Sequence, residues 1–321
     1  MYSNANFPKS LKYWYNGKFW NWVEGSLHPM THALHYGTSV FEGIRAYSTA
    51  KGPAIFRLPE HTDRFFHSAS VLHMRVPKTR EEIIDLIKAT VRENKLESCY
   101  IRPMLFYAFG NLGLVPKLCP VELVIGAWEW GAYLGKSALE GASVCIVPWR
   151  RLHHSQTDMK AKLGGLYAQS TINGIEAREN GFDEAVFLNL EGRIAEGPGE
   201  NIFIVRGKTL KTNSGSESIL EGITRTSVLE LGQDAGYKTE VGPISKEEFF
   251  TADEAFFSGT AVEISPIIRV TDRSDARTAA KEYILGDGKP GPITLDIRRR
   301  FLEIVVGKVK KFSKWLTYVN E

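Results

Sequence analysis

The pattern of the chain changes near residue 142, and this change limits the folds open to it. Before it, apolar residues recur at helical spacing over 60–72 and 80–94, and strand-like runs follow at 99–107 and 121–128. After it, many short strand-like runs joined by tight turns outnumber a few helical segments. This order of elements favours an α+β fold over a doubly wound parallel sheet.

Local signals define the individual elements. In the aromatic stretch KYWYNGKFW, the turn pair Asn16-Gly17 predicts a β-hairpin. Near the C-terminus, Ile297, Phe301 and Ile304 have the spacing of a helix. The other elements expected after residue 142 are a strand over 142–149, a helix that begins after Gly165 and ends at Asn180-Gly181, a helix over 224–235, and a strand with a glycine turn within 254–267.

The length of the chain indicates two domains, because 321 residues exceed what one ordinary core requires. We expect a small α/β domain over 1–130, an interdomain loop over 131–141, and a large domain over 142–321. No run of about 18 apolar residues occurs, so no membrane-spanning helix is predicted.

Composition points to a folded protein of a reducing compartment. The hydrophobic fraction of 43% and the charged fraction of 24% are typical of soluble domains. The N-terminal peptide MYSNANFPKS is polar and lacks the apolar core of a signal peptide. Three widely spaced cysteines, Cys99, Cys119 and Cys145, favour free thiols over disulfides or zinc knuckles. We therefore expect a cytoplasmic protein.

Charge gives no support to a nucleic-acid partner. The net charge is only +3, and the basic residues are scattered apart from Arg298-Arg299-Arg300 and the later GKVKKFSK. Both groups lie in the C-terminal segment with helical spacing, where a solvated helix face explains them. A nucleic-acid site would need a broader basic stripe.

Several catalytic and binding motifs are incomplete. His28 and His32 are four residues apart, as in zinc-binding helices, and His35 is near, but Pro29 interrupts them and no H-E-x-x-H pattern follows. No metal site is predicted. The stretch GAYLGKS has three residues between its glycines where a phosphate-binding P-loop has four. No G-x-S-x-G occurs, which excludes an α/β-hydrolase nucleophile elbow.

The stretch TDMKAKLGGLY holds two lysines, Lys160 and Lys162, before Gly164-Gly165. A lysine amine is a nucleophile only when deprotonated, which partial burial or a nearby cation favours. A lysine beside two glycines, which would let a bulky ligand approach, suits covalent bonding to an aldehyde cofactor such as pyridoxal phosphate. Close lysine pairs are also ordinary surface features, and the spacing alone does not choose between the two.

Pyridoxal phosphate would make three further demands, and the chain offers candidates for each. Glu196, before Gly197-Pro198-Gly199, is either an acid that pairs with the ring nitrogen or a turn residue. Gly222-Ile223-Thr224 begins a helix and is either an anion site or a simple threonine N-cap. The turn Ser258-Gly259-Thr260 could form a nest of backbone donors, and Arg64 could add a positive charge.

Longer motifs resemble a known family. The chain is similar to the branched-chain-amino-acid aminotransferases, which are class IV, fold-type IV pyridoxal-phosphate enzymes with the fold of D-amino-acid aminotransferase. The resemblance runs nearly end to end. The motifs that carry it are HALHYGTSVFEGIRAY (32–47), YIRP (100–103), WGAYLG (130–135), EGPGENIF (196–203), GITR (222–225), SGTAVEISPI (258–267) and GPIT (291–294).

The resemblance assigns roles to the cofactor residues. The family lysine precedes x-Gly-Gly-x-Tyr, which matches Lys162 and not Lys160. It implies that Tyr167 bonds the ring hydroxyl oxygen and that Glu196 pairs with the ring nitrogen. The residues implied to hold the phosphate are Arg64, Ile223, Thr224 and Thr260, with Ile223 acting through its backbone N–H.

The resemblance also implies the substrates and the assembly. Branched-chain L-amino acids and 2-oxoglutarate would exchange an amino group, and the backbone amides of Thr260 and Ala261 would meet the substrate carboxylate. The residues implied to line or support the substrate pocket are Tyr36, Phe41, Gly43, Arg45, Tyr100, Arg102 and Trp130. Family members share active sites between subunits, so a homodimer or larger homo-oligomer is implied. The loop 109–117 departs from the Gly-x-Gly before a valine that many relatives carry there, which affects substrate preference.

Two rival functions remain to be weighed. D-amino-acid aminotransferases and R-selective amine aminotransferases have the same fold, and the chirality of the accepted substrate separates them from the branched-chain group. A binding protein that lost the chemistry would lack one of the reactive residues, whereas Lys162, Glu196 and Arg64 are all present.

Overall fold

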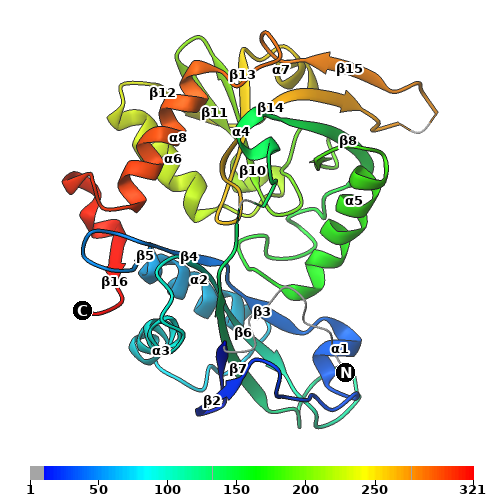
Figure 1. Cartoon of the computed structure of the whole chain (residues 1–321). Coiled ribbons are helices and arrows are strands. Elements are labelled where there is room, and N and C mark those ends of the chain that lie inside the picture. The colour runs from blue at the N-terminus through cyan, green and yellow to red at the C-terminus, as the bar shows by residue number, and fades with distance from the viewer. Residues whose placement is uncertain (1–10, 132, 276) are drawn as a thin grey trace. The chain divides into compact units, whose positions relative to one another are not determined.

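The computed structural model describes residues 11–131, 133–275 and 277–321, which divide between two compact units (Figure 1). Unit 1 contains the chain up to Trp130, together with Ala161–Leu166 and Glu303–Glu321. Unit 2 contains Gly131–Lys160 and Tyr167–Leu302. Both returning segments were predicted to lie in the second domain, 142–321. The peptide MYSNANFPKS lies outside the described residues.

Unit 1 is an eight-stranded sheet packed with two long helices. The strand order is β16-β5-β4-β6-β7-β1-β2, and β3 pairs with β6 beside this path. Its elements are β1 (Lys12–Tyr15), β2 (Lys18–Asn21), α1 (His32–Tyr36), β3 (Ser39–Phe41), β4 (Ile44–Tyr47), β5 (Ala54–Phe56), α2 (Leu58–Val71), α3 (Arg80–Glu93), β6 (Cys99–Tyr107), β7 (Val121–Trp128), η3 (Lys310–Trp315) and β16 (Leu316–Tyr318).

The C-terminal strand explains why unit 1 takes the end of the chain. β16 pairs antiparallel with β5, with Leu316 opposite Phe56. Trp315, which immediately precedes it, is 2% exposed and meets Phe56 edge to face. Large buried aromatic rings contribute strongly to a core, and this contact joins residues roughly 260 positions apart in the chain. Sequence periodicity carries no signal for such a pairing.

Unit 2 is built on a second eight-stranded sheet, of order β12-β11-β10-β13-β14-β8-β9, with β15 paired to β14. Parallel pairing occurs at β11–β12, β8–β9 and β8–β14. Its elements are α4 (Ser137–Glu140), β8 (Ala142–Arg150), α5 (Tyr167–Glu179), β9 (Glu184–Leu188), β10 (Asn201–Arg206), β11 (Thr209–Thr212), η2 (Gly215–Glu217), α6 (Ile223–Asp234), β12 (Lys238–Val241), α7 (Lys246–Phe250), β13 (Glu254–Gly259), β14 (Glu263–Asp272), β15 (Lys281–Ile284) and α8 (Pro292–Val305), whose last residues from Glu303 belong to unit 1. The short helix η1 (Gly164–Leu166) lies in unit 1.

The helices of unit 2 pack along its sheet. α5 contacts β8 and β9, and α6 contacts β12 and β13. The N-terminus of α8 is bound by a buried carboxylate: Ile293 and Thr294 donate their backbone N–H groups to Glu254 at 3.0 and 2.7 Å. A carboxylate at this end satisfies otherwise unpaired donors and complements the helix dipole.

The sequence predictions of elements are mostly confirmed. The strands 99–107 and 121–128 have the expected bounds, and Asn16 and Gly17 form the expected turn between β1 and β2 with positive φ. The helix expected over 60–72 begins earlier, at Leu58. The short helices α1, α4 and α7 were not predicted, because four or five residues carry too little periodicity. The α+β class is confirmed.

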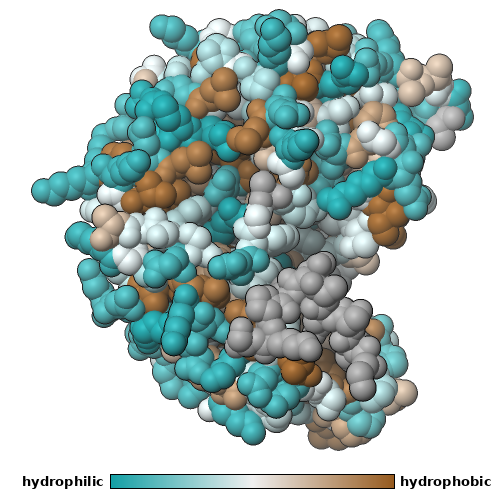
Figure 2. Space-filling model, viewed as in Figure 1, coloured by the Kyte–Doolittle hydropathy of each residue, from teal (hydrophilic) through white to brown (hydrophobic). Residues whose placement is uncertain are grey.

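The surface is mixed in character. The face seen in Figure 2 is covered mostly by hydrophilic side chains, with hydrophobic ones in separate small groups. Among the described residues, no helix combines the length and the apolar character needed to cross a membrane.

Candidate active site

Lys162 lies in unit 1, in the short segment that returns to the β3 edge. Its backbone N–H donates to Ser68 Oγ at 2.8 Å, and its carbonyl accepts from the N–H of Phe41 at 3.3 Å. Its ammonium nitrogen lies 4.9 Å from the centre of the Phe41 ring. The side chain is half-buried, whereas that of Lys160, in unit 2, is exposed. The surroundings therefore separate two lysines that sequence spacing could not.

The glycines after Lys162 are explained by close packing within unit 1. A Cβ on Gly164 would lie 2.1 Å from Ser39 Oγ, and one on Gly165 would lie 3.3 Å from the carbonyl oxygen of Gly37. The sequence analysis attributed these glycines to room for a bulky ligand. The structure gives a different reason, since β3 and the Gly37 turn occupy the space that side chains would need.

Arg64 is held by a buried acid that the sequence analysis did not single out. Arg64, on α2, donates from Nε and Nη2 to the two carboxylate oxygens of Glu42 at 2.6 and 2.8 Å. His61 Nδ1 lies 2.8 Å from Glu42 Oε2. Burial alone would raise the pKa of Glu42, but Arg64 and His61 outweigh it and hold this pKa well below its ordinary value. Burial lowers the pKa of His61, which keeps the ring neutral.

The predicted substrate residues of unit 1 form a cluster on β6 and its neighbours. Arg102 Nη2 donates to Tyr100 Oη at 2.7 Å, and the guanidinium lies 4.6 Å from the Phe41 ring centre. Trp130 meets Tyr100 edge to face at 4.4 Å between ring centres. A Cβ on Gly43 would lie 2.1 Å from Tyr100 Oη, so glycine is needed for the tyrosine to reach this position.

Two further predicted residues lie at the margin of this cluster. Arg45 is the register partner of Tyr100 across the β4–β6 pair. Tyr36 contacts the loop 109–117 instead, where its hydroxyl donates to the carbonyl of Leu112 at 3.0 Å. Side chains of this loop are prominently exposed, with Leu114 at 74%.

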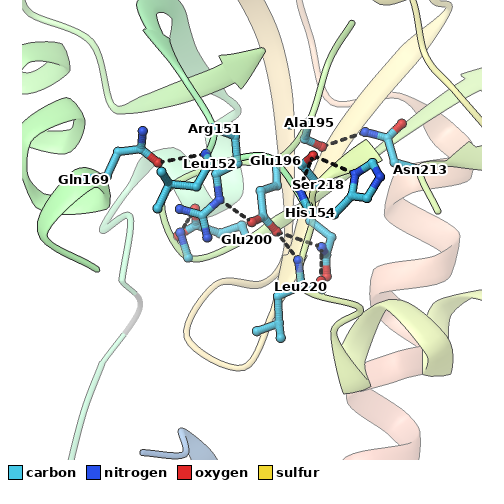
Figure 3. Close-up of polar contacts among 12 residues, drawn as sticks. Arg151, Leu152, His154, Gln169, Ala195, Glu196, Glu200, Asn213, Ser218 and Leu220 are labelled. Atoms are coloured by element: carbon cyan, nitrogen blue, oxygen red, sulfur yellow. Dashed lines mark hydrogen bonds and ion pairs between the residues drawn. The ribbon is translucent and has the colours of Figure 1, made fainter. Parts of the chain in front are cut away.

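Glu196, in unit 2, is a buried carboxylate with several donors (Figure 3). Arg151 Nε donates to its Oε1 at 2.9 Å, and the backbone N–H of Leu220 donates to Oε2 at 3.1 Å. Asn201 Nδ2 is 3.3 Å from the same oxygen. Arg151 and Glu196 are each 5% exposed, so the pair compensates a buried charge. Protein donors, and not solvent, therefore surround the Glu196 carboxylate.

Arg151 was missed by the sequence analysis. It follows β8, and its guanidinium also lies over the Phe187 ring, 5.5 Å from its centre. Its Nη1 has no hydrogen-bond partner among the described residues. An arginine next to Arg150 at the end of a strand looks like any surface cation in the sequence, whereas in the structure its backbone N–H donates to the carbonyl of Leu188, next to Phe187, whose N–H donates to the carbonyl of Glu196.

The N-terminus of α6 distinguishes the two readings of Gly222-Ile223-Thr224. The N-cap is Gly222, with no side-chain cap, and Thr224 lies inside the first turn. The threonine N-cap reading is therefore wrong. Gly222 donates its N–H to Asn201 Oδ1 at 3.1 Å, and a Cβ on it would lie 2.3 Å from that oxygen. First-turn N–H groups without a side-chain cap are anion-binding groups.

The turn with Thr260 and Ala261 connects β13 to β14, and Gly259 pairs with Glu263 across it. Ser258, at the end of β13, is fully buried, and its Oγ has no hydrogen-bond partner among the described residues. A buried hydroxyl usually has a partner, so this one marks a place for a polar group. Tyr167 is the first residue of α5.

The three closely spaced histidines serve structural contacts. His32 contacts Thr38 and the carbonyl of Gly113, His28 stacks on Phe109, and His35 contacts the carbonyl of Pro29. No group of three His, Cys, Asp or Glu side chains suited to a metal occurs in the part of the chain that the structure describes.

A cavity of about 590 Å³ lies in unit 2, between two loops. It is lined by His154, Ser155, Gln156, Thr157, Asp158, Met159, Lys160, Gly215, Ser216 and Ile219. None of the predicted cofactor or substrate residues is among them. The loop 154–160 leads directly into the segment that carries Lys162.

Comparison with known proteins assigns the family. The family model described as "Amino-transferase class IV" matches residues 39–270. The chain belongs to this family. The branched-chain-amino-acid aminotransferase of Pseudomonas aeruginosa is 42% identical to this aminotransferase over 308 residues, which are 96% of the present chain and 97% of the relative. Similarity of this extent places it among the branched-chain-amino-acid aminotransferases, as the sequence motifs implied.

Solved structures agree with this assignment. A branched-chain amino acid aminotransferase from the source abbreviated T.th., complexed with N-(5'-phosphopyridoxyl)-L-glutamate, has a TM-score of 0.88 and 42% identity, covering 97% of this aminotransferase and 99% of that chain. The same protein complexed with 4-methylvaleric acid has the same TM-score, identity and coverage. The fold-type IV prediction is confirmed.

Proposed function

We propose that this aminotransferase uses pyridoxal phosphate to transfer the amino group of leucine, isoleucine or valine to 2-oxoglutarate. The observation that carries the proposal is Lys162, set in its x-Gly-Gly-x-Tyr sequence in a chain of this family. The T.th. relative supports the substrate class, because its structures hold both a phosphopyridoxyl glutamate and a branched aliphatic acid.

The residues of unit 2 fit the cofactor. The uncapped N-terminus of α6 suits a phosphate, and the unpartnered Oγ of Ser258 provides a further polar group on β13, the strand that α6 contacts. Glu196, with its charge compensated by Arg151, is a buried acceptor suited to a protonated ring nitrogen.

We assign the cofactor contacts accordingly. Lys162 would bond to the cofactor covalently, Tyr167 would bond its ring hydroxyl oxygen, and Glu196 would accept from its ring nitrogen. The phosphate would be held by Arg64, Ile223, Thr224 and Thr260. When bound, pyridoxal phosphate supplies an electron sink that stabilises a carbanion at the substrate Cα.

Lys162 has the acid–base role in this proposal. When not bonded to the cofactor, the amine of Lys162 would act as the general base that accepts the proton of the substrate Cα, and would donate that proton again as the acid. Glu196 would accept a hydrogen bond from the ring nitrogen and would stabilise its protonated form. The Phe41 ring beside Lys162 limits the positions that the amine can take.

The cluster on β6 would have to bind the side chains of two different substrates. Arg102 can form a bidentate ion pair with the γ-carboxylate of 2-oxoglutarate, and its Nε has no partner among the described residues. The rings of Phe41, Tyr100 and Trp130 can contact a branched aliphatic chain. Gly43, Arg45 and Tyr36 support this wall, and the amides of Thr260 and Ala261 would receive the α-carboxylate.

We further propose a cytoplasmic homodimer or larger homo-oligomer. Exposed apolar side chains gather in and around the loop 109–117 and on α1. They include Leu34, Leu112, Leu114, Val115 and Leu118. An apolar group of this kind on a globular surface marks a protein contact, and a second copy of the chain is the partner that the family provides.

A substrate panel tests the function. Initial rates as kcat/KM with 2-oxoglutarate should be high for L-leucine, L-isoleucine and L-valine and very low for D-alanine and for R-configured aromatic amines. Purified protein should be yellow, and borohydride should attach the cofactor to Lys162. Activity on D-alanine without activity on L-leucine would favour the D-amino-acid alternative, which the named relatives do not favour.

A further inference from the structure

Glu42 is a fully buried carboxylate with an unusually complete set of donors. Its backbone is fixed between β3 and β4, where its N–H donates to the carbonyl of Pro103 at 3.0 Å. Its Oε1 accepts from Arg64 Nε at 2.6 Å. Its Oε2 accepts from Arg64 Nη2 at 2.8 Å and lies 2.8 Å from His61 Nδ1. Hydrogen bonds therefore hold both carboxylate oxygens, and the carboxylate has a single orientation.

This geometry determines the plane of the Arg64 guanidinium. A guanidinium carries five N–H donors, and the two parallel bonds to Glu42 use the edge formed by Nε and Nη2. The two N–H groups of Nη1 and the second N–H of Nη2 do not face Glu42, so the carboxylate sets the direction in which they point. Without the carboxylate, the long arginine side chain would have several rotamers.

His61 completes the arrangement from the same helix. It is 1% exposed and neutral, so a proton on Nδ1 can point to Glu42 without bringing a further charge into the core. The hydroxyl of Ser68, one turn beyond Arg64, donates to the Arg64 carbonyl at 2.8 Å and accepts from the backbone N–H of Lys162 at 2.8 Å. α2 thus links the orientation of Arg64 to the backbone of Lys162.

We propose that Glu42, oriented by His61, is a positioning residue that holds Arg64 in the orientation in which it binds the cofactor phosphate. This inference rests on the proposed function, since it concerns the same cofactor. Burying a charge pair costs desolvation free energy, so the pair is poorly explained by a gain in stability. Its effect on the orientation of Arg64 explains it better. Glu42 acts through Arg64, so the loss of Glu42 should weaken specifically the binding of the cofactor phosphate group.

The experiment compares pyridoxal phosphate with pyridoxal, which lacks the phosphate. Dissociation constants are measured on the full-length chain freed of cofactor, by absorbance and by the ligand-dependent rise of Tm. In Glu42→Gln, the preference for pyridoxal phosphate over pyridoxal should fall about tenfold, as expected for a weakened charged hydrogen bond. Pyridoxal itself should bind within about twofold of wild type.

Two other variants keep the test decisive. His61→Gln, which leaves the ion pair in place, should reduce the same preference to a smaller extent, even if Glu42→Gln does not fold. Asp63→Asn is the matched control, because Asp63 adjoins Arg64 on α2 and pairs with Arg80 at the exposed surface. Its preference should equal that of wild type.

The outcomes separate two failures. An unchanged or increased preference in Glu42→Gln and His61→Gln would overturn the positioning role, because an unrestrained guanidinium would then serve the phosphate equally well. A wild-type chain that binds neither pyridoxal phosphate nor pyridoxal would overturn the proposed function itself.

Discussion

Lys162 is the residue on which the proposed chemistry depends. Lys162→Ala removes both the covalent attachment and the base, so transamination should fall by several orders of magnitude. Lys160→Ala should keep most of the wild-type rate, because the Lys160 side chain is exposed. Single-turnover rates with L-leucine measure both variants. An inactive Lys160→Ala variant together with an active Lys162→Ala variant would show that the wrong lysine was assigned.

Arg102 should distinguish the two substrates of the reaction. Arg102→Gln keeps a polar side chain near Tyr100 but loses the bidentate ion pair, so KM for 2-oxoglutarate should rise about tenfold to a hundredfold. The KM for 4-methyl-2-oxopentanoate, which has no γ-carboxylate, should change little. Steady-state kinetics with each oxo acid provide the comparison. Equal losses for both acids would remove Arg102 from carboxylate recognition.

His61 should give the stability curve a recognisable slope. Its folded pKa lies below the ordinary value of 6.5, so below that pH the unfolded chain binds a proton that the native chain does not. Stability from this group is therefore present above pH 6.5 and is lost as pH falls, by at most about 1.4 kcal/mol per pH unit. Glu42, whose pKa is also lowered, adds its loss only below about pH 4.5.

Urea unfolding between pH 5 and 7 measures this slope. His61→Gln should flatten it, whatever the variant does to stability at pH 7. His67→Gln, on the exposed side of the same helix, is the control and should retain the wild-type slope. A His61→Gln curve parallel to wild type would contradict the assignment of a neutral, buried ring.

At the level of elements, the contact between η1 and β3 depends on a missing side chain. Gly164→Ala would place a methyl group 2.1 Å from Ser39 Oγ and 3.4 Å from the Ser39 Cβ and carbonyl oxygen, so the serine hydroxyl must rotate away, or β3 or η1 must shift. We expect a loss of about 1–3 kcal/mol in the free energy of unfolding, as for other overpacked sites. Because only Leu163 separates η1 from Lys162, the rate of transamination should fall as well.

Matched variants identify the cause of that loss. Ser39→Ala removes the obstructing oxygen, so the double variant Ser39→Ala/Gly164→Ala should recover part of the stability. Gly242→Ala, where nothing lies within 4 Å of the added Cβ, should change the free energy of unfolding little. Chemical denaturation of the set would refute the packing argument if Gly164→Ala and Gly242→Ala behaved alike.

At the level of the whole molecule, the apolar group around the loop 109–117 should control assembly. Leu118 is 76% exposed, so Leu118→Asp should not disturb the fold of the subunit but should place a charge in the proposed contact. Sedimentation equilibrium should show wild-type oligomers and a population of monomers in the variant. Leu190→Asp, 58% exposed in unit 2, is the control. If Leu190→Asp dissociated the oligomer and Leu118→Asp did not, the interface would lie on unit 2 and not at the loop 109–117.

Some residues of the site can be predicted from the sequence, whereas the residues that orient them are found only in the structure. Lys162, Glu196 and the start of α6 could be proposed from the sequence, because the motifs that carry them lie within a few residues. The partners that orient them were not accessible: Arg151 reaches Glu196 across 45 positions, and Glu42 reaches Arg64 across 22. A contact across that separation depends on strand register, which a single sequence does not encode locally.

Local signals in the sequence predict the fold class and most of the long elements, because periodicity and turn chemistry are local, and Lys162 as the cofactor lysine stays a proposal that rests on a family motif. Only the tertiary structure showed that Ala161–Leu166 and the C-terminal strand belong to unit 1, that Gly222 and not Thr224 caps α6, and that Gly164 is required by Ser39. These features depend on which surfaces pack together when the sheets form. The free energy of that packing comes from contacts between residues that are far apart in the chain.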